Sequence, residues 1–127
     1  MRDIEFRGKD VCYGEWLYGF YLMSLSQDNN KRHHVIQIDG LAFDVDPETV
    51  GQYTGLKAKN SVHVFDGDIV KDGAGSRYLI YWHDEALSWF VKNGDLDVPL
   101  ADLDGCVSVL KVIGNIHDDP KLLEEIK

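Results

Sequence analysis

A chain of 127 residues is long enough for one hydrophobic core, and its composition, 44% hydrophobic and 28% charged, is that of an ordinary globular protein. Its formal net charge of −9 disfavours nucleic acid as a partner, because phosphate backbones are bound by Lys and Arg. The chain has no apolar run near the roughly 20 residues that span a bilayer, and its first residues form no apolar signal core. We therefore expect a cytoplasmic protein without membrane contact.

The negative charge is unevenly placed along the sequence. Residues 1–38 hold five acidic and five basic side chains, whereas residues 39–127 hold 17 acidic and eight basic ones. Solubility is the simplest explanation of this excess. The alternative is an acidic surface that meets a basic protein or imitates DNA.

The N-terminal part of the chain is predicted to consist of strands. Residues 3–7 alternate between polar and apolar side chains, as a half-buried strand does, and a turn is expected at 8–10. A second strand is expected to begin at 11–13. The aromatic run 16–25 favours another strand, and Gly19 inside it indicates a bulge or a close approach of two backbones.

A hairpin and a helical turn are expected next. Residues 33–39 alternate again and are predicted to pair with 41–43 across the dipeptide Asp39-Gly40, which is typical of tight hairpins. Residues 46–50 begin with Asp-Pro, a combination that suits the start of a helix. We therefore predict a single helical turn there.

The central stretch 50–72 contains glycines at its turns. Gly51 and Gly55 are expected to adopt φ values that other residues avoid. Short strands are predicted at 62–65 and 69–70, joined by a turn at Asp66-Gly67. Each part of this stretch thus has a structural explanation.

The C-terminal half is predicted to continue as strands and to end in a helix. The run 78–82 is the clearest strand and should pair with 87–91, and Asn93-Gly94 marks a turn. A last strand is expected at 107–113. The tail, 118–127, is predicted to be a helix with Asp119 as its N-cap and Pro120 at its first position. A helix of this length does not persist alone in water, so its apolar face should dock on the barrel or on a neighbouring subunit.

About nine short strands without long intervening helices exclude a parallel α/β sheet and indicate a small antiparallel barrel or sandwich. We expect one domain over residues 1–127, with N-terminal strands in 1–45, a barrel region in 46–117 and the helix in 118–127.

Chemical signatures were sought among the histidines and cysteines. His33 and His34 are adjacent and would point to opposite faces of a strand, and no HExxH, CxxC, GxSxG or phosphate-loop pattern is present. We therefore predict no catalytic, metal-binding or cofactor-binding residues. Cys12 and Cys106 lie far apart and are expected to be reduced, buried thiols.

The chain is rich in tyrosine and tryptophan for its size. Core packing should absorb most of these side chains, and the remainder suit protein interfaces. Within the central stretch, Tyr53 and Thr54 are the two positions for which we predict a contact role.

Several stretches together resemble the YopX family of phage and prophage proteins. The most specific are Gly51-Gln52-Tyr53-Thr54-Gly55-Leu56 and Phe65-Asp66-Gly67-Asp68-Ile69-Val70. Further matches are Ile4-Glu5-Phe6-Arg7, Trp16-Leu17-Tyr18-Gly19, Val112-Ile113-Gly114-Asn115-Ile116 and Pro120-Lys121-Leu122-Leu123. One connection departs from the family: Lys59-Asn60-Ser61 stands where members tend to have Lys-Asn-Gly, and without that glycine a tight primed turn is not expected.

The resemblance implies a mainly β protein with a small SH3-like antiparallel barrel, additional N-terminal strands and a short C-terminal helix. It also implies a homo-oligomer, and it gives no enzymatic activity that could be carried over to this chain, so we expect a protein that is not an enzyme. The leading hypothesis is a phage or prophage accessory protein that acts through host or phage protein partners in the bacterial cytoplasm. The alternatives are an acidic DNA-mimic inhibitor of a host nucleic-acid enzyme, and an enzyme whose site is assembled from distant residues.

Overall fold

The computed structural model describes residues 3–25, 31–102 and 109–126. These parts of the chain contain ten strands in antiparallel sheets and one short C-terminal α-helix, so the predicted mainly β architecture is confirmed. The chain divides into two compact units, residues 1–53 and 54–127, which we call unit 1 and unit 2.

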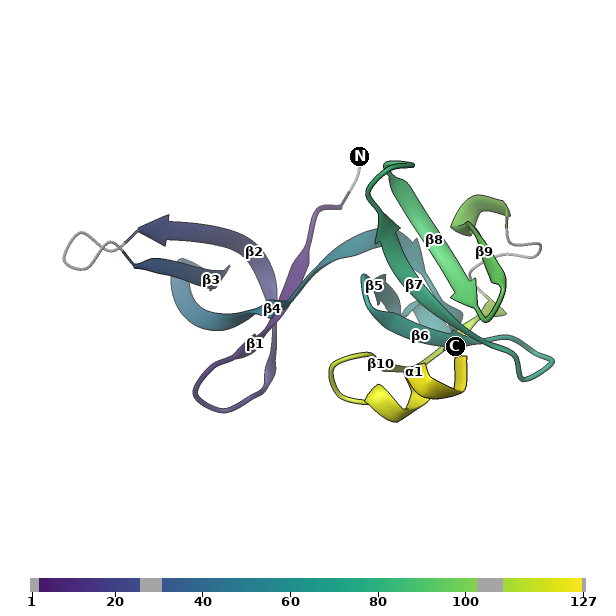
Figure 1. Ribbon diagram of the computed structural model, residues 1–127. Coiled ribbons are helices and arrows are strands. Elements are labelled where there is room, and N and C mark those ends of the chain that lie inside the picture. Colours follow the sequence, from purple (N-terminus) through teal and green to yellow (C-terminus); the bar gives the residue numbers. More distant parts are fainter. Residues whose placement is uncertain (1–2, 26–30, 103–108, 127) are drawn as a thin grey trace. The chain divides into compact units, whose positions relative to one another are not determined.

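The strands of unit 1 are joined in a ring of antiparallel pairs (Figure 1). They are β1 (Phe6–Asp10), β2 (Trp16–Leu25), β3 (Arg32–Ile38) and β4 (Leu41–Lys57), the last of which continues into unit 2. β1 pairs with β2, β2 with β3 and β3 with β4, and β4 then returns to pair with β1. Ile36 and Val45 are buried, so the ring encloses a small core of its own.

Two local predictions for unit 1 are confirmed and two are wrong. Gly19 lies so close to β3 that a Cβ there would overlap the carbonyl oxygen of Gln37. Asp39 and Gly40 both have positive φ, 49° and 83°, as the primed turn of a two-residue hairpin requires. The turn expected at 8–10 and the strand expected at 11–13 are wrong. Residues 8–10 belong to β1, where Gly8 and Lys9 pair with β2, and the turn follows at 11–13.

The helical turn predicted at 46–50 is also wrong, because this segment lies inside β4. The pairing of β4 with β1 is irregular here: Lys9 pairs with Asp46, and the next pair joins Arg7 to Gly51. Four residues of β4 therefore stand opposite a single residue of β1 and form a bulge. Pairing with a distant strand has overridden the local preference of the Asp-Pro sequence for a helix.

Unit 2 contains a five-stranded antiparallel sheet in the order β10-β6-β7-β8-β9. Its elements are β5 (His63–Phe65), which pairs with β4, β6 (Asp68–Lys71), β7 (Arg77–His83), β8 (Ser88–Asn93), β9 (Leu96–Pro99), β10 (Lys111–Asn115), the 3-10 turns η1 (Lys59–Ser61) and η2 (Leu100–Asp102), and α1 (Pro120–Ile126). Its core is aliphatic and consists of Ala58, Val64, Val70, Ile80, Val91, Leu100 and Leu110. The first residues of the strand predicted at 107–113 lie outside the described residues.

Of the three glycines expected at turns in the central stretch, two have the backbone conformation predicted for them. Gly55 and Gly67 have positive φ, 88° and 89°, but Gly51 does not, so the expectation for Gly51 is wrong. The predicted pairing of 78–82 with 87–91 is confirmed by the β7–β8 ladder. These features agree with the small β fold expected from the sequence.

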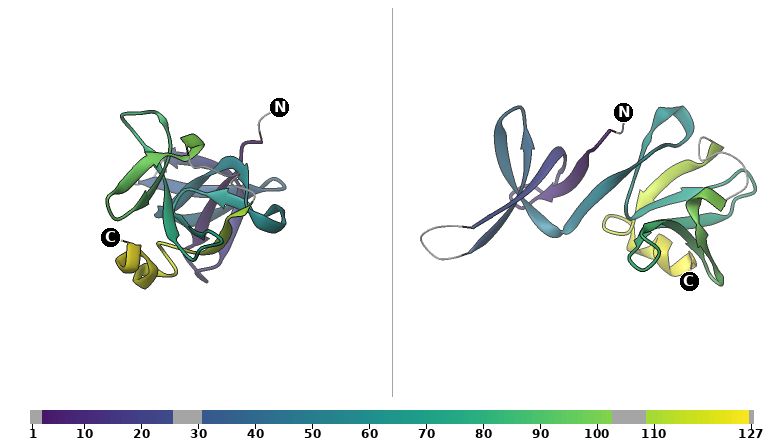
Figure 2. Two further views of the ribbon diagram at one scale, coloured as in Figure 1. Left: turned by 90° about the vertical axis from the view of Figure 1, so that its right-hand side faces the viewer. Right: turned by 90° about the horizontal axis from the view of Figure 1, so that it is seen from above.

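The C-terminal helix packs on its own unit. α1 contacts β7 and β10, and Figure 2 shows it (yellow) beside the end of the sheet. Ile126 is buried, and its carbonyl oxygen accepts the N–H of Gly94 at 2.6 Å. Arg77 and Glu125 form an ion pair between β7 and α1. The predicted docking of this helix is therefore confirmed, with the barrel region as its partner.

Candidate functional site

Tyr53 and Thr54, the two predicted contact residues, lie at the division between the units. Tyr53 is only 3% exposed, and its N–H donates to the carbonyl oxygen of Glu5 at 2.8 Å. Burial, with the negative charges of Asp3 and Glu5, raises the pKa of Tyr53. Thr54 is half-buried, and its hydroxyl oxygen accepts the N–H of Leu56 at 3.1 Å. Both residues thus contribute to the fold of the chain itself, and their role in contacting another molecule stays a prediction.

The histidines and the one cysteine that the structure describes do not gather into a metal site. No group of three His, Cys, Asp or Glu side chains that could hold a metal occurs within residues 3–25, 31–102 and 109–126. Cys12 is a free, exposed thiol in the turn after β1, so its predicted burial is wrong, and Cys106 lies outside the described residues. Nor does any helix in the described ranges have the length and apolar character needed to cross a membrane.

Unit 2 holds two tyrosines with raised pKa. The Tyr78 hydroxyl donates to Asp72 at 2.9 Å, and burial together with this bond raises the Tyr78 pKa. Desolvation opposes ionisation of Asp72, but the bonds from Tyr78 and from the N–H groups of Ser76 and Ala74 outweigh it and lower the Asp72 pKa. Through these hydrogen bonds Asp72 holds the loop between β6 and β7 in place, so its lowered pKa has a structural explanation.

The second of these tyrosines is Tyr81 on β7. Burial, followed by a hydrogen bond to Asp97 of β9, raises the pKa of Tyr81 to about 12. Its ring lies 6.1 Å from that of Phe90, and the ring of His83 lies 4.3 Å from Phe90. With such a pKa, the Tyr81 hydroxyl is a donor and not a base at neutral pH.

An exposed apolar row on β2 is the most prominent surface feature of unit 1. Tyr18, Phe20 and Leu22 are spaced two apart and therefore share one face of the strand, and they are 46%, 63% and 48% exposed. On the neighbouring strands the partners of Phe20 and Leu22 are Gln37 and Val35. We call Tyr18, Phe20 and Leu22 the β2 row. Contiguous apolar surface of this kind marks sites of protein contact.

Sequence reasoning did not single out the β2 row. The run 16–25 is apolar at both odd and even positions, which predicts a strand covered on both faces. On the face opposite the β2 row, Leu17 and Tyr21 are half-buried, whereas Met23 and Leu25 near the end of the strand are exposed, at 53% and 59%. The apolar side chains of 16–25 are evident in the sequence, but only the pairing of β2 with β1 and β3 decides which of them are exposed.

The family model described as YopX protein matches residues 5–124. The chain belongs to the YopX family. The resemblance inferred from its glycine-containing central stretch is thereby confirmed, and the family match extends over both units.

A similar solved structure is that of protein EF1440 from Enterococcus faecalis. It is 25% identical in sequence, with a TM-score of 0.56, and the similarity covers 97% of this chain and 99% of that chain. The two proteins are therefore similar along their whole length. No curated protein matches the chain.

One connection departs from the YopX pattern and yet keeps a tight turn. In Lys59-Asn60-Ser61, Asn60 and Ser61 have φ values of 64° and 61°. Two consecutive positive φ values are the mark of a primed turn, so the expectation that such a turn would be absent is wrong. Ser61 adopts a conformation that glycine would adopt at lower cost.

The acidic charge of this YopX-family chain is divided between its units. Residues 1–53 carry nine acidic and five basic side chains, and residues 54–127 carry 13 and eight. The excess of acidic over basic side chains is therefore four in unit 1 and five in unit 2. This even division gives the DNA-mimic hypothesis no additional support.

Proposed function

We propose that this protein is a non-enzymatic accessory protein of a phage or prophage that acts in the bacterial cytoplasm by protein contact, first with further copies of itself. The observation that carries the proposal is the β2 row, three large apolar side chains exposed on one face of a strand. Tyrosine and phenylalanine are enriched in protein interfaces because they bury a large area with few rotatable bonds.

The charge around the row supports a second copy as the partner. Two copies of a chain with a net charge of −9 repel each other over most of their surfaces. The β2 row and its cross-strand neighbours Val35 and Gln37 are uncharged. Identical copies can meet over these uncharged side chains, and the carboxylate next in register on this face is Asp44, which pairs with Val35.

Light scattering after size-exclusion chromatography tests this proposal. We expect an assembly larger than a monomer at about 10–100 μM, the range in which contacts of micromolar affinity are populated. Phe20→Ser should shift the mass toward the monomer, because it removes the most exposed side chain of the row. The matched control is Tyr13→Ser, which removes another exposed aromatic side chain of unit 1.

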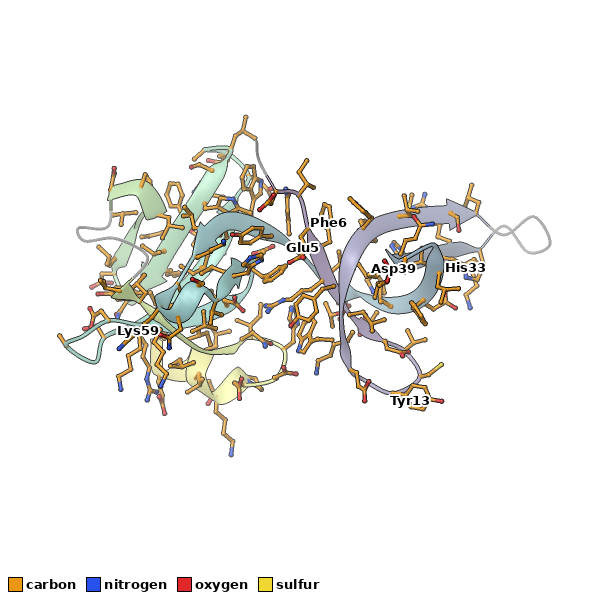
Figure 3. All side chains as sticks on the ribbon, turned by 180° about the vertical axis from the view of Figure 1, so that it is seen from behind. Glu5, Phe6, Tyr13, His33, Asp39 and Lys59 are labelled. Carbon is orange, nitrogen blue, oxygen red and sulfur yellow. The ribbon has the colours of Figure 1, made fainter. Side chains whose placement is uncertain are left out.

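Tyr13 lies at the tip of the loop between β1 and β2, outside the row (Figure 3), and is 81% exposed. Its substitution should leave the mass unchanged. A wild-type protein that stays monomeric throughout this range, or equal dissociation by both variants, would overturn the proposal.

A further inference from the structure

A pocket of about 420 Å³ lies in unit 1 at the point where β4 leaves β3. The ladder between these strands ends at the pair Val35–Asp44, and the next residue of β4, Val45, already pairs with Asp10 of β1. The first residues of β3 and the departing part of β4 therefore form the two arms of a fork. We call the space between them the fork pocket, and its volume is typical of small-molecule sites.

The β3 side of the fork pocket bears nitrogen-containing side chains. Four consecutive residues line it, namely Lys31, Arg32, His33 and His34. The two histidines alternate along β3, where Figure 3 labels His33, and yet both border the same pocket because it lies at the end of the β3–β4 ladder. In a chain with an excess of nine acids, this run is a local concentration of positive charge.

His34 is held in place from β2. Its Nδ1 is hydrogen-bonded to the Tyr21 hydroxyl at 2.6 Å, and the two rings lie nearly parallel, 7° apart. When the hydroxyl donates this bond, the ring proton resides on Nε2, which is then a donor. Tyr21 thus keeps one imidazole oriented at the wall of the pocket, which lowers the cost of ordering it around a ligand.

The opposite side of the fork pocket is mainly apolar. Val11, Val45 and Pro47 line it together with one carboxylate, Asp44. Asp44 Oδ1 lies 3.8 Å from His33 Nδ1, and both side chains are well exposed, at 59% and 40%. Among the described lining residues, two side chains, Lys31 and Arg32, are cationic and one, Asp44, is a carboxylate.

We propose that the fork pocket binds a small organic anion. Its phosphate or carboxylate headgroup would lie against Arg32 and His34, and its body against Val45 and Pro47. A guanidinium offers forked donors that match either oxyanion, and the pocket is larger than a bare anion requires. Long polyanions do not fit this description, since unit 1 carries nine acidic against five basic side chains and repels them.

The test is a titration of the isotope-labelled full chain at low ionic strength, followed by amide chemical shifts, with inorganic phosphate, adenosine monophosphate and succinate as separate probes. With at least one probe, we expect saturable changes in the amide chemical shifts, and we expect them only at the start of β3 and at Val45. Binding of the phosphate compounds alone identifies a phosphate headgroup, and binding of succinate identifies a carboxylate.

Three variants complete the test. Arg32→Ala should weaken binding at least tenfold, and Asp44→Asn should strengthen it, because each changes the charge beside the headgroup. Lys92→Ala, which removes an exposed cation of β8 in unit 2, should change nothing. Shifts with none of the three probes, shifts spread equally over the lysines of both units, or unchanged affinity in Arg32→Ala would overturn the proposal.

Discussion

The N–H of Gly94, in the turn between β8 and β9, donates a hydrogen bond of 2.6 Å to the carbonyl oxygen of Ile126 at the end of α1. Gly94 has a φ of 54°, a backbone conformation that favours glycine, although a Cβ there would lie 3.9 Å from this carbonyl oxygen, an ordinary contact distance. The buried Ile126 side chain, at 5% exposure, holds the same helix end from inside unit 2. The last turn of the chain is therefore part of the folded unit.

Ile126→Ala should destabilise the protein by about 2–4 kcal/mol, the usual cost of truncating a buried isoleucine to alanine. Urea unfolding followed by tryptophan fluorescence measures this loss. Glu124→Ala is the matched control, since Glu124 lies on the exposed side of α1 and its removal should change stability by less than about 0.5 kcal/mol. Equal effects of both substitutions would show that α1 does not anchor unit 2.

Gly67→Val should lower the thermal midpoint by several degrees. Gly67 has a φ of 89°, a conformation that costs a β-branched residue about 1–3 kcal/mol. A Cβ at this position would also lie 3.4 Å from Cγ1 of Ile116. Differential scanning calorimetry measures the shift, and an unchanged midpoint would contradict the strained turn.

Gly73→Val is the control for that experiment. Gly73 lies in the loop between β6 and β7, its φ is not in the left-handed region, and a Cβ there meets no atom within 4 Å. Its substitution should leave the midpoint within about one degree of the wild type, because exposed substitutions without strain are usually near neutral.

Ser61→Gly should stabilise the protein by about 0.5–1 kcal/mol. The serine has a φ of 61°, where an L-residue costs about 1–2 kcal/mol, and part of the gain is offset by the greater freedom of glycine in the unfolded chain. Asn60→Gly serves as comparison, since asparagine tolerates the left-handed region and should gain less. Chemical denaturation of the two variants measures the difference, and a loss of stability in Ser61→Gly would contradict this explanation.

Local chemistry predicted those parts of the fold that depend on neighbouring residues. The strand at 16–25, the close approach at Gly19 and the Asp39-Gly40 hairpin follow from side-chain type and from the backbone freedom of glycine. The C-terminal helix followed from its proline and its apolar face. In each case the type of residue at the position was enough for the prediction, even where, as at Gly19, the contact itself is with another strand.

Distant pairing explains what the sequence did not predict. The Asp-Pro segment at 46–50 has the local features of a helix start, but β1 pairs on both sides of it and draws it into β4. The fork pocket exists only because β4 leaves β3 after Asp44 to join β1. Likewise, the exposure of the β2 row depends on which strands flank β2. No local pattern contains this information.

The pKa of Tyr81 gives a prediction for alkaline pH. Burial and the hydrogen bond to Asp97 raise it to about 12, above the ordinary tyrosine value of about 10. The neutral phenol is thus favoured in the folded state. The stability that Tyr81 contributes should be complete below about pH 10 and should be lost as the pH rises through about 12.

Asp97→Asn tests the origin of this shift. It should lower the pKa of Tyr81, because the carboxylate that opposes phenolate formation is gone, but burial should keep it above the ordinary value. The pKa values of Tyr53 and Tyr78 are raised as well, so the difference in phenolate absorbance between variant and wild type isolates Tyr81. Asp95→Asn, in the exposed turn before β9, should leave the titration unchanged. If both variants titrate like the wild type, Asp97 does not act on Tyr81 in solution.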